Sequence, residues 1–257
     1  MGEGLTKEGL QEFTDNWVRS NGMREASERA IEDAVRLLSV PVLGELSSET
    51  IKEQIVLCEK CNKRKIEFKN IEYIFDRWNG EDIITAVGEY FISERLKEKL
   101  EEKEIKGYET ISIKTSFTKN KAGVKKFGKN AYQKELPNFY HLKVKGRTEA
   151  HLDGWFKVIS TCESCGRERR MITIDALNSI ADPSTLNKDD KFLIPNIYFD
   201  TWNNEDDLFL FVESINHPVI TQNFIDCLTE LGIELNKKES IWVRSVKWIN
   251  RNVDIIE

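Results

Sequence analysis

Two pairs of cysteines with identical spacing place the tightest limit on how this chain can fold. Cys58 and Cys61 form one Cys-x-x-Cys pair, and Cys162 and Cys165 form another, 104 residues further along the chain. One such turn can present two sulfur atoms to a tetrahedral metal ion, and two turns supply the four thiolates of a closed structural zinc site. The sequence therefore predicts one structural Zn²⁺ bound by all four cysteines, which requires two distant segments to meet.

The residues beside each pair agree with this prediction. Gly166 follows the second pair and suits a tight turn with a positive φ. Asn62 holds the matching place after the first pair, and asparagine is the next most suitable residue type for that conformation. A zinc ion with four thiolates carries a charge of −2. The nearby cations that would offset this charge are Lys60, Lys63, Arg64, Arg167, Arg169 and Arg170.

Two other interpretations of the cysteines stay open. The pairs could be unconnected, or they could do redox chemistry without a metal. A thioredoxin-like motif has a single pair at the start of a helix within a βαβ pattern, which does not fit two pairs in β-rich sequence. The fifth cysteine, Cys227, falls on the apolar stripe of a predicted helix, and we interpret it as a small buried hydrophobic residue.

The sequence on either side of each pair predicts a β-hairpin. The segments "EQIVLC" and "KIEFK" flank the first turn, and "KVISTC" and "MITI" flank the second. β-Branched residues that alternate with polar ones are typical of strands. Each cysteine pair is therefore predicted to lie at the tip of a hairpin.

A further similarity links the two halves of the chain. "FDRWNGED" at 75–82 matches "FDTWNNED" at 199–206 in six of eight positions. Residues 92–107 align with residues 220–235, and each segment predicts a helix that begins after Ser93 or Thr221 as its N-cap. Apolar residues then fall in register, pairing Leu96 with Phe224, Leu100 with Leu228 and Ile105 with Ile233. The order of hairpin, turn, helix and strand occurs twice, which predicts an internal repeat.

Together these patterns predict an α+β fold of two pseudo-repeated halves, each made of β-hairpins plus a helix, sharing a zinc-knuckle seam. The predicted units are an N-terminal helical segment (1–50), a first repeat with a zinc knuckle and a basic connection (51–150), and a second repeat with a zinc knuckle (151–257). Apolar residues at helical spacing, among them Leu10, Phe13, Trp17 and Leu38, favour the helical segment.

Charge is distributed unevenly along the chain. The net charge is −6, but residues 114–147 contain ten Lys or Arg and one Glu, a net +9, so the remainder carries −15. An acidic chain argues against nucleic acid as the main partner. We interpret residues 114–147 as a solvated Lys-rich connection. The alternative is that bases stack on its aromatic side chains, which are Phe117, Phe127, Tyr132, Phe139 and Tyr140.

No catalytic pattern accompanies the cysteines. The three histidines, His141, His151 and His217, lack metal-ligand spacing, and the sequence has neither a Gly-rich phosphate loop nor a Gly-x-Ser-x-Gly motif. A closed site of four thiolates also leaves no coordination position for a substrate. We therefore expect a binding protein and not an enzyme. The sequence contains no apolar run long enough for a transmembrane helix and no signal peptide, so we expect a cytoplasmic location and no membrane partner.

These features resemble one known family. Two Cys-x-x-Cys knuckles, the second continuing as "CESCG", and a helix phrase such as "ISERLKEKLEEKEIKG" are similar to the double-CxxCG immunity proteins of bacterial toxin systems. The resemblance covers about residues 53–250, and it departs from the pattern at Asn62, where the family has glycine. It implies a cytoplasmic protein that binds and neutralises a cognate protein toxin through residues that the resemblance does not identify.

Two groups of acidic residues are our candidates for partner contact. They are Glu25, Glu28, Glu32 and Asp33 in the first, and Glu205, Asp206 and Asp207 in the second. An acidic surface would steer a basic partner. The alternative function is a zinc-ribbon nucleic-acid-binding or regulatory protein that uses residues 114–147.

Overall fold

The computed structural model describes residues 35–119, 135–152, 154–174, 196–203, 205–211, 218–236, 241–246 and 248–249. Within these ranges the chain is mostly β-strand, with two α-helices and a 3-10 turn, so the predicted α+β class is confirmed. The helices are α3 (Glu94–Glu102) and α6 (Gln222–Glu230), and the turn is η4 (Phe199–Thr201). The strands of the part up to residue 119 are β1 (Val35–Ser39), β2 (Gly44–Leu46), β3 (Ile51–Cys58), β4 (Lys63–Lys69), β5 (Glu72–Phe75), β6 (Ile83–Ala86), β7 (Glu89–Ser93), β8 (Tyr108–Ser112) and β9 (Lys114–Phe117).

The later strands follow a similar succession. They are β10 (Phe139–Val144), β11 (Gly146–Thr148), β12 (Ala150–His151), β13 (Phe156–Thr161), β14 (Glu168–Ile172), β15 (Asn196–Tyr198), β16 (Leu208–Phe211), β17 (Val219–Ile220), β18 (Trp242–Ser245) and β19 (Trp248–Ile249).

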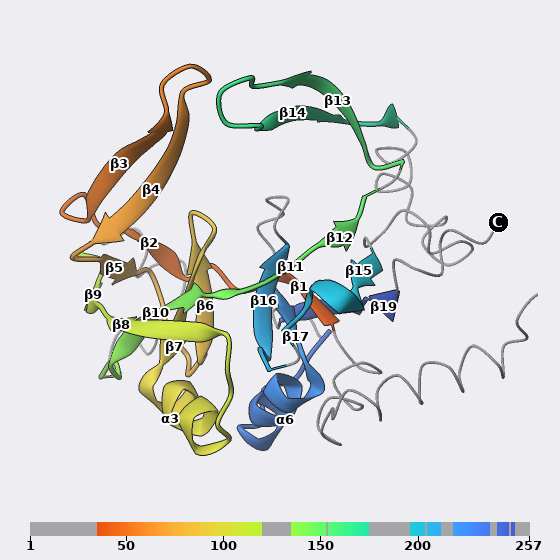
Figure 1. Cartoon of the computed structure of the whole chain (residues 1–257). Helices are drawn as coiled ribbons and strands as arrows, with labels where there is room; N and C mark the ends of the chain where they lie inside the picture. Colours follow the sequence, from red (N-terminus) through yellow and green to blue (C-terminus); the bar gives the residue numbers. More distant parts are fainter. Residues whose placement is uncertain are drawn as a thin grey trace, which may run out of the picture.

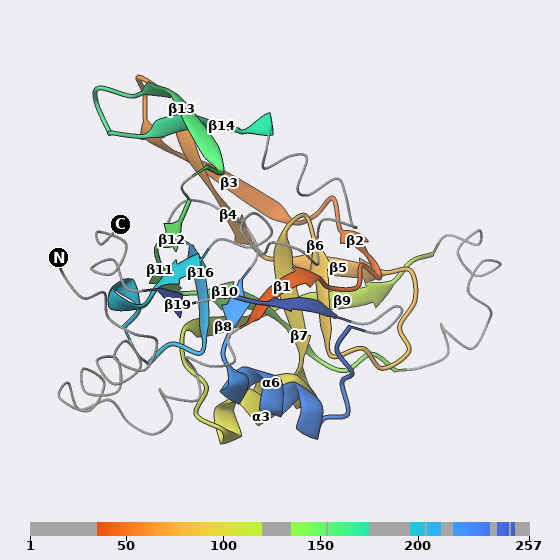
Figure 2. The ribbon, with the colours of Figure 1, turned by 90° about the vertical axis from the view of Figure 1, so that its right-hand side faces the viewer.

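Two long hairpins project from the body of the protein (Figures 1 and 2). We call residues 51–69, with β3 and β4, the first arm, and residues 156–172, with β13 and β14, the second arm. Each arm is a separate two-stranded antiparallel sheet, as the sequence around the cysteines predicted. The arms leave the body at different places and approach each other at their tips (Figure 1).

The described part of the body contains sheets of corresponding order. One sheet has the order β6-β7-β10-β8, and another contains β16-β17-β1-β18, with β11 added beside β16. Neighbours within these two sets of four are all antiparallel. Two three-stranded sheets, β2-β5-β9 and β12-β15-β19, each combine one antiparallel pair with one parallel pair.

Each of the two larger sheets receives a strand from a distant part of the chain. Strand β1 lies between β17 and β18, with Val35 opposite Ile220 and Ser245. Strand β10 lies between β7 and β8, with His141 opposite Phe91 and Ile111. Strand β1, which comes before the first arm in the chain, therefore completes the sheet that leads to α6. Strand β10, which comes before the second arm, completes the sheet that leads to α3.

The predicted N-terminal helical segment is wrong where the structure describes it. Residues 35–39 form β1 and residues 44–46 form β2, although the apolar spacing had predicted helix up to about residue 50. Backbone pairing on both sides of β1 satisfies its N–H and C=O groups, and this tertiary pairing outweighs a weak local helical preference. The earlier part of the predicted segment, with Leu10, Phe13 and Trp17, lies outside the described residues.

Helices α3 and α6 pack side by side at the end of the body away from the arms (Figures 1 and 2). Leu96 and Leu100 of α3 and Phe224 and Leu228 of α6 are fully buried in one hydrophobic cluster, in the register that the alignment predicted. Among the described residues, no helix is both long and apolar enough to cross a lipid bilayer.

Both helices begin at their predicted N-cap residues, each of which touches a buried aspartate. The Ser93 hydroxyl accepts a hydrogen bond from the Leu96 N–H at 3.2 Å and donates one to Asp82 at 2.6 Å. Thr221 occupies the same position before α6, but its hydroxyl donates to Asp207 at 2.6 Å and makes no cap bond. The aspartate that follows each Phe-Asp-x-Trp turn therefore fixes the start of the helix.

The segment 114–147 is part of the body at both of its described ends. Strand β9 pairs with β5, and β10 lies inside a sheet. Phe139 is fully buried, and Phe117 and Tyr140 are half-buried, so Phe139 is not available to stack on a base. The prediction of a connecting segment is wrong for these ends, because they are paired strands of the body, although lysines such as Lys114 and Lys119 remain exposed. Phe127 and Tyr132 lie outside the described residues.

Candidate metal centre

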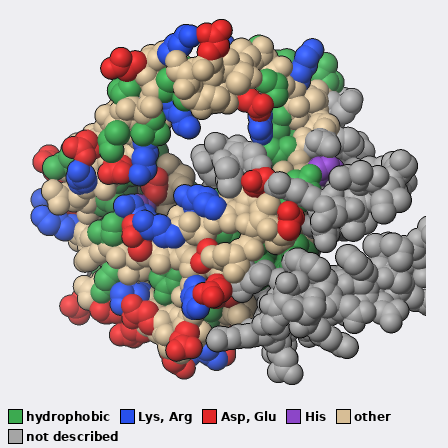
Figure 3. All heavy atoms as spheres, in the orientation of Figure 1, with side chains coloured by type: hydrophobic (Ala, Val, Ile, Leu, Met, Phe, Trp, Pro, Cys, Tyr) green, Lys and Arg blue, Asp and Glu red, His purple; other side chains and the backbone are tan. Residues whose placement is uncertain are grey.

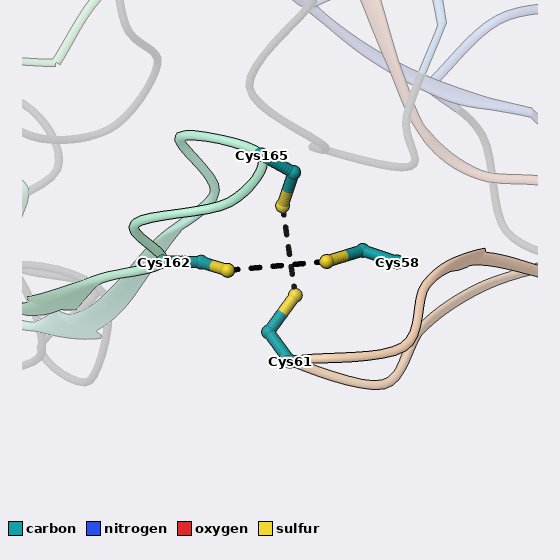
Figure 4. A group of neighbouring side chains, drawn as sticks. All are labelled: Cys58, Cys61, Cys162 and Cys165. Atoms are coloured by element: carbon teal, nitrogen blue, oxygen red, sulfur yellow. Dashed lines mark hydrogen bonds between the residues drawn. The ribbon is translucent and has the colours of Figure 1, made fainter.

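The four paired cysteines meet where the tips of the two arms approach each other. Cys58 and Cys61 lie at the end of β3 and in the turn that follows it, and Cys162 and Cys165 lie in the turn between β13 and β14. Figure 4 shows the four sulfur atoms converging from the two turns. The sequence prediction that the two distant pairs come together is confirmed, and the interpretation as two unconnected pairs is excluded.

The spacing of the sulfur atoms fits a single tetrahedral ion. Cys58 Sγ lies 3.9 Å from Cys162 Sγ, Cys61 Sγ lies 3.6 Å from Cys165 Sγ, and all four atoms lie within 4.8 Å of one another. A tetrahedron with metal–sulfur bonds of about 2.3 Å has sulfur–sulfur edges of about 3.8 Å. A disulfide requires about 2.05 Å, so the cysteines are free thiols in this geometry. The cluster could therefore hold one metal ion.

Both turns adopt the backbone conformation that the sequence predicted. Asn62 has a φ of 52° and Gly166 a φ of 68°. The Gly166 N–H donates to the Cys162 carbonyl at 2.8 Å, and the Asn62 N–H donates to the Glu59 carbonyl at 3.4 Å. This bend turns the N–H groups inside each Cys-x-x-Cys segment toward the first sulfur, which is the arrangement that stabilises a thiolate ligand.

These N–H groups change the acidity of the thiols. The Cys61 N–H lowers the pKa of Cys58, and the Cys165 and Ser164 N–H groups lower the pKa of Cys162 to about 6. The N–H of Arg167 also favours the thiolate of Cys165, but desolvation and the neighbouring sulfurs outweigh it and raise the pKa of Cys165 to about 11. Because four adjacent thiolates repel one another, a cation among them is the natural way to hold all four deprotonated.

One ion pair also joins the two tips. Lys60 Nζ of the first arm lies 2.6 Å from a carboxylate oxygen of Glu163 in the second arm. Both side chains are mostly exposed, so the pair contributes little to stability compared with a metal bound by four thiolates. Sequence reasoning treated Lys60 only as a counter-charge and missed Glu163. The signal was an acid in "CESC" and a cation in "CEKC", each between two cysteines that were expected to meet.

The remaining candidates from the sequence lie elsewhere. His141 is buried and lies 2.7 Å from Glu89, His151 packs edge-on against Tyr198, and His217 falls outside the described residues. In the described ranges, the four paired cysteines are the one group of potential ligands close enough together to hold a metal. Cys227 is fully buried in α6, as predicted.

The acidic residues proposed for partner contact need a correction. Asp207 is buried and accepts hydrogen bonds from the Lys106 N–H, the Thr221 hydroxyl and the Asn223 amide, so it supports the fold and cannot serve as a contact residue. Glu205 pairs with Lys106 at 3.0 Å. The group from Glu25 to Asp33 lies outside the described residues.

Comparison with known proteins adds no assignment. No protein-family model matches the chain, and no curated protein matches it.

Proposed function

We propose that this chain is a zinc-bridged, cytoplasmic binding protein that sequesters a protein partner and has no catalytic turnover. The observation that carries the proposal is the composition of the arms. Eight of the twelve large hydrophobic side chains that are exposed in the described residues lie on them: Ile51, Ile55, Val56, Leu57, Ile66, Val158, Ile159 and Met171. Concentrated apolar exposure of this kind marks interaction surfaces.

The form of the arms supports the same conclusion. Neither arm pairs with another strand in the described part of the chain, so the outer edges of each ribbon are unpaired there, and only the base of the first arm, at Phe68, packs against the core of the body. Figure 3 shows an opening below the two arms, with Lys and Arg side chains at its border. A fold whose core lies in the body has no packing reason to keep two such ribbons, but a partner that covers them would supply one.

Zinc is the ion that we propose at the tips. Four soft thiolates in a tetrahedral arrangement select zinc or iron, and zinc is the usual choice for a closed site built from two Cys-x-x-Cys turns. A cytoplasmic location suits it, because a reducing compartment keeps the thiols free. We also propose that the chain is duplicated and that each repeat provides one knuckle, a proposal for which we cite the corresponding strand orders of the two sheets.

The expected metal content is about one zinc ion per chain. Elemental analysis of protein purified under reducing conditions without added metal measures this ratio directly. Cys61→Ser removes one of four ligands and should lower the zinc content well below one. Cys227→Ser should leave the ratio unchanged. Stoichiometric iron, or a ratio near zero in fresh reduced protein, would contradict the assignment of zinc.

The proposed partner is a protein toxin, and the support for this step is the resemblance to double-CxxCG immunity proteins. If the proposal holds, a toxin gene lies beside the gene for this chain. Co-expression should then rescue cells from that toxin, and the two proteins should elute together from a sizing column. Cell death in the presence of abundant folded protein, with no complex on the column, would remove the immunity function.

A second candidate rests on the charge of the arms. They contain ten Lys or Arg and five Glu, a net +5, so the rest of the chain carries −11. A basic ribbon could bind nucleic acid, whereas the alternative predicted from the sequence placed that binding on residues 114–147. A gel shift that weakens as salt rises would support this second function. The large hydrophobic side chains exposed on the arms include no aromatic ring, which favours a protein partner.

A further inference from the structure

A cavity of about 540 Å³ lies against the cysteine cluster, between the tips of the two arms, and Cys61 and Cys162 form part of its lining. Its lining includes three cations, Lys60, Arg167 and Arg169, with the hydroxyl groups of Ser160 and Thr161. The acid in the lining, Glu163, already pairs with Lys60. No ion pair of Arg167 or Arg169 occurs among the described residues, so two guanidinium groups remain to bind an anion.

The negative charge of the metal centre would not neutralise all the positive charge of the arms. The arms carry +5, and zinc with four thiolates would contribute −2, which leaves about +3 on the arms. Guanidinium groups bind carboxylates through two parallel hydrogen bonds, which gives both affinity and orientation. Hydroxyl groups beside them can donate further hydrogen bonds to the same oxygens. The cavity therefore suits a carboxylate better than a cation or an apolar group.

The surroundings of the cavity indicate where the carboxylate comes from. Phosphates would also attract arginine, but single-stranded nucleic acid needs aromatic platforms, and the two phenylalanines of the arms, Phe68 and Phe156, are half-buried. The exposed large residues are aliphatic, and they suit the apolar part of a protein interface. An acidic group within an apolar protein surface complements the arms in both respects.

We propose that the cavity receives an aspartate or glutamate side chain of the partner protein, while the aliphatic side chains of the arms contact the apolar surface around it. This inference rests on the proposed binding function, and it identifies the arm tips as the contact region. It replaces the earlier expectation of acidic contact residues on this chain, because the region with the most exposed apolar surface is basic.

The two knuckles provide a matched control. Arg167 directly follows the positive-φ residue of the second knuckle, and Lys63 directly follows the positive-φ residue of the first. Arg167 lines the cavity, whereas Lys63 does not. Arg167→Glu and Lys63→Glu therefore make the same change of charge at corresponding positions beside the metal. They differ in whether the changed side chain faces the cavity.

The probe is a fluorescein-labelled peptide in which glutamates alternate with leucines, and a second peptide carries glutamine in place of each glutamate. Fluorescence anisotropy with the zinc-loaded full chain should show tighter binding of the glutamate peptide. Arg167→Glu should weaken that binding about tenfold or more, as loss of a charge-paired contact does. Arg169→Glu should act in the same direction, and Lys63→Glu should have a much smaller effect. Zinc content measured for every variant confirms that the knuckles remain intact.

Several results would overturn the inference. These are failure of the glutamate peptide to bind, equal affinity for the glutamine peptide, and equal loss in Lys63→Glu. Tighter binding of a single-stranded DNA oligonucleotide than of the peptide would assign the surface to nucleic acid instead. A toxin complex that forms in co-expression and tolerates Arg167→Glu would also overturn it, while leaving the proposed binding function in place.

Discussion

Removal of the proposed zinc ion is expected to release the arms and leave the body folded. Isolated two-stranded hairpins are at best marginally stable in water. Apart from the cysteines, both arms are mostly exposed, and the tips are joined by the cysteine cluster and by the pair of Lys60 with Glu163. A structural zinc site contributes on the order of 10 kcal/mol of apparent binding free energy. Most of that free energy should therefore stabilise the folded conformation of the arms.

Hydrogen–deuterium exchange measures this release segment by segment. With a chelator, or in Cys162→Ser, residues 51–69 and 156–172 should lose protection by several orders of magnitude, whereas β7 and β10 should keep theirs. Cys227→Ser is the control, because Cys227 is fully buried in the cluster under α6. The buried hydroxyl of the new serine should lower the free energy of unfolding of the body by roughly 1–3 kcal/mol. The zinc content and the protection of the arms should stay unchanged. Arms that remain protected without metal, or a body that unfolds together with them, would contradict this expectation.

Gly107→Ala is expected to destabilise the whole body by about 3 kcal/mol or more. Gly107 has a φ of +91°, which strains any residue with a Cβ, and a Cβ built there would lie 2.2 Å from the Leu208 carbonyl oxygen. The Gly107 carbonyl also accepts hydrogen bonds from the N–H groups of Lys145 at 2.7 Å and Gly146 at 3.0 Å. The substitution would therefore push three neighbouring elements apart: the segment that follows α3, strand β11 and strand β16.

A second glycine separates the clash from the backbone strain. Gly88 also has a positive φ, +79°, but a Cβ there would meet no atom within 4 Å. Gly88→Ala should lower the free energy of unfolding by about 1 kcal/mol, through backbone strain alone. Denaturant unfolding of both variants measures the difference. Equal losses would show that the backbone around Leu208 moves aside at no cost and that the close approach does not limit stability.

The candidate site was predictable because its signals are local. A Cys-x-x-Cys spacing, a residue suited to positive φ and flanking β-branched segments all act within about a dozen residues of each knuckle. The N-cap positions Ser93 and Thr221 and the apolar register of the two helices depend on local spacing in the same way. The structure agrees with each of these predictions.

The errors arose where a segment's conformation depends on distant partners. Residues 35–39 have apolar spacing that suits a helix, yet they pair with β17 and β18, more than 180 residues away in the chain. Asp207 lies in an acidic run that looks solvated, but the fold places Thr221 and Asn223 around its carboxylate. Periodicity and composition carry no information about such pairings.

The sequence by itself determined the four metal-ligand candidates, the two hairpins that carry them and the two amphipathic helices, since each follows from the spacing of nearby residues. Only the tertiary structure decided that β1 and β10 each complete a distant sheet, and it confirmed the predicted meeting of the arms at their tips. It also decided that Arg167 and Arg169 line a cavity there. The physical reason is that long-range strand pairing and burial are set by the packing of the whole body, in which any one segment has only a small share of the free energy.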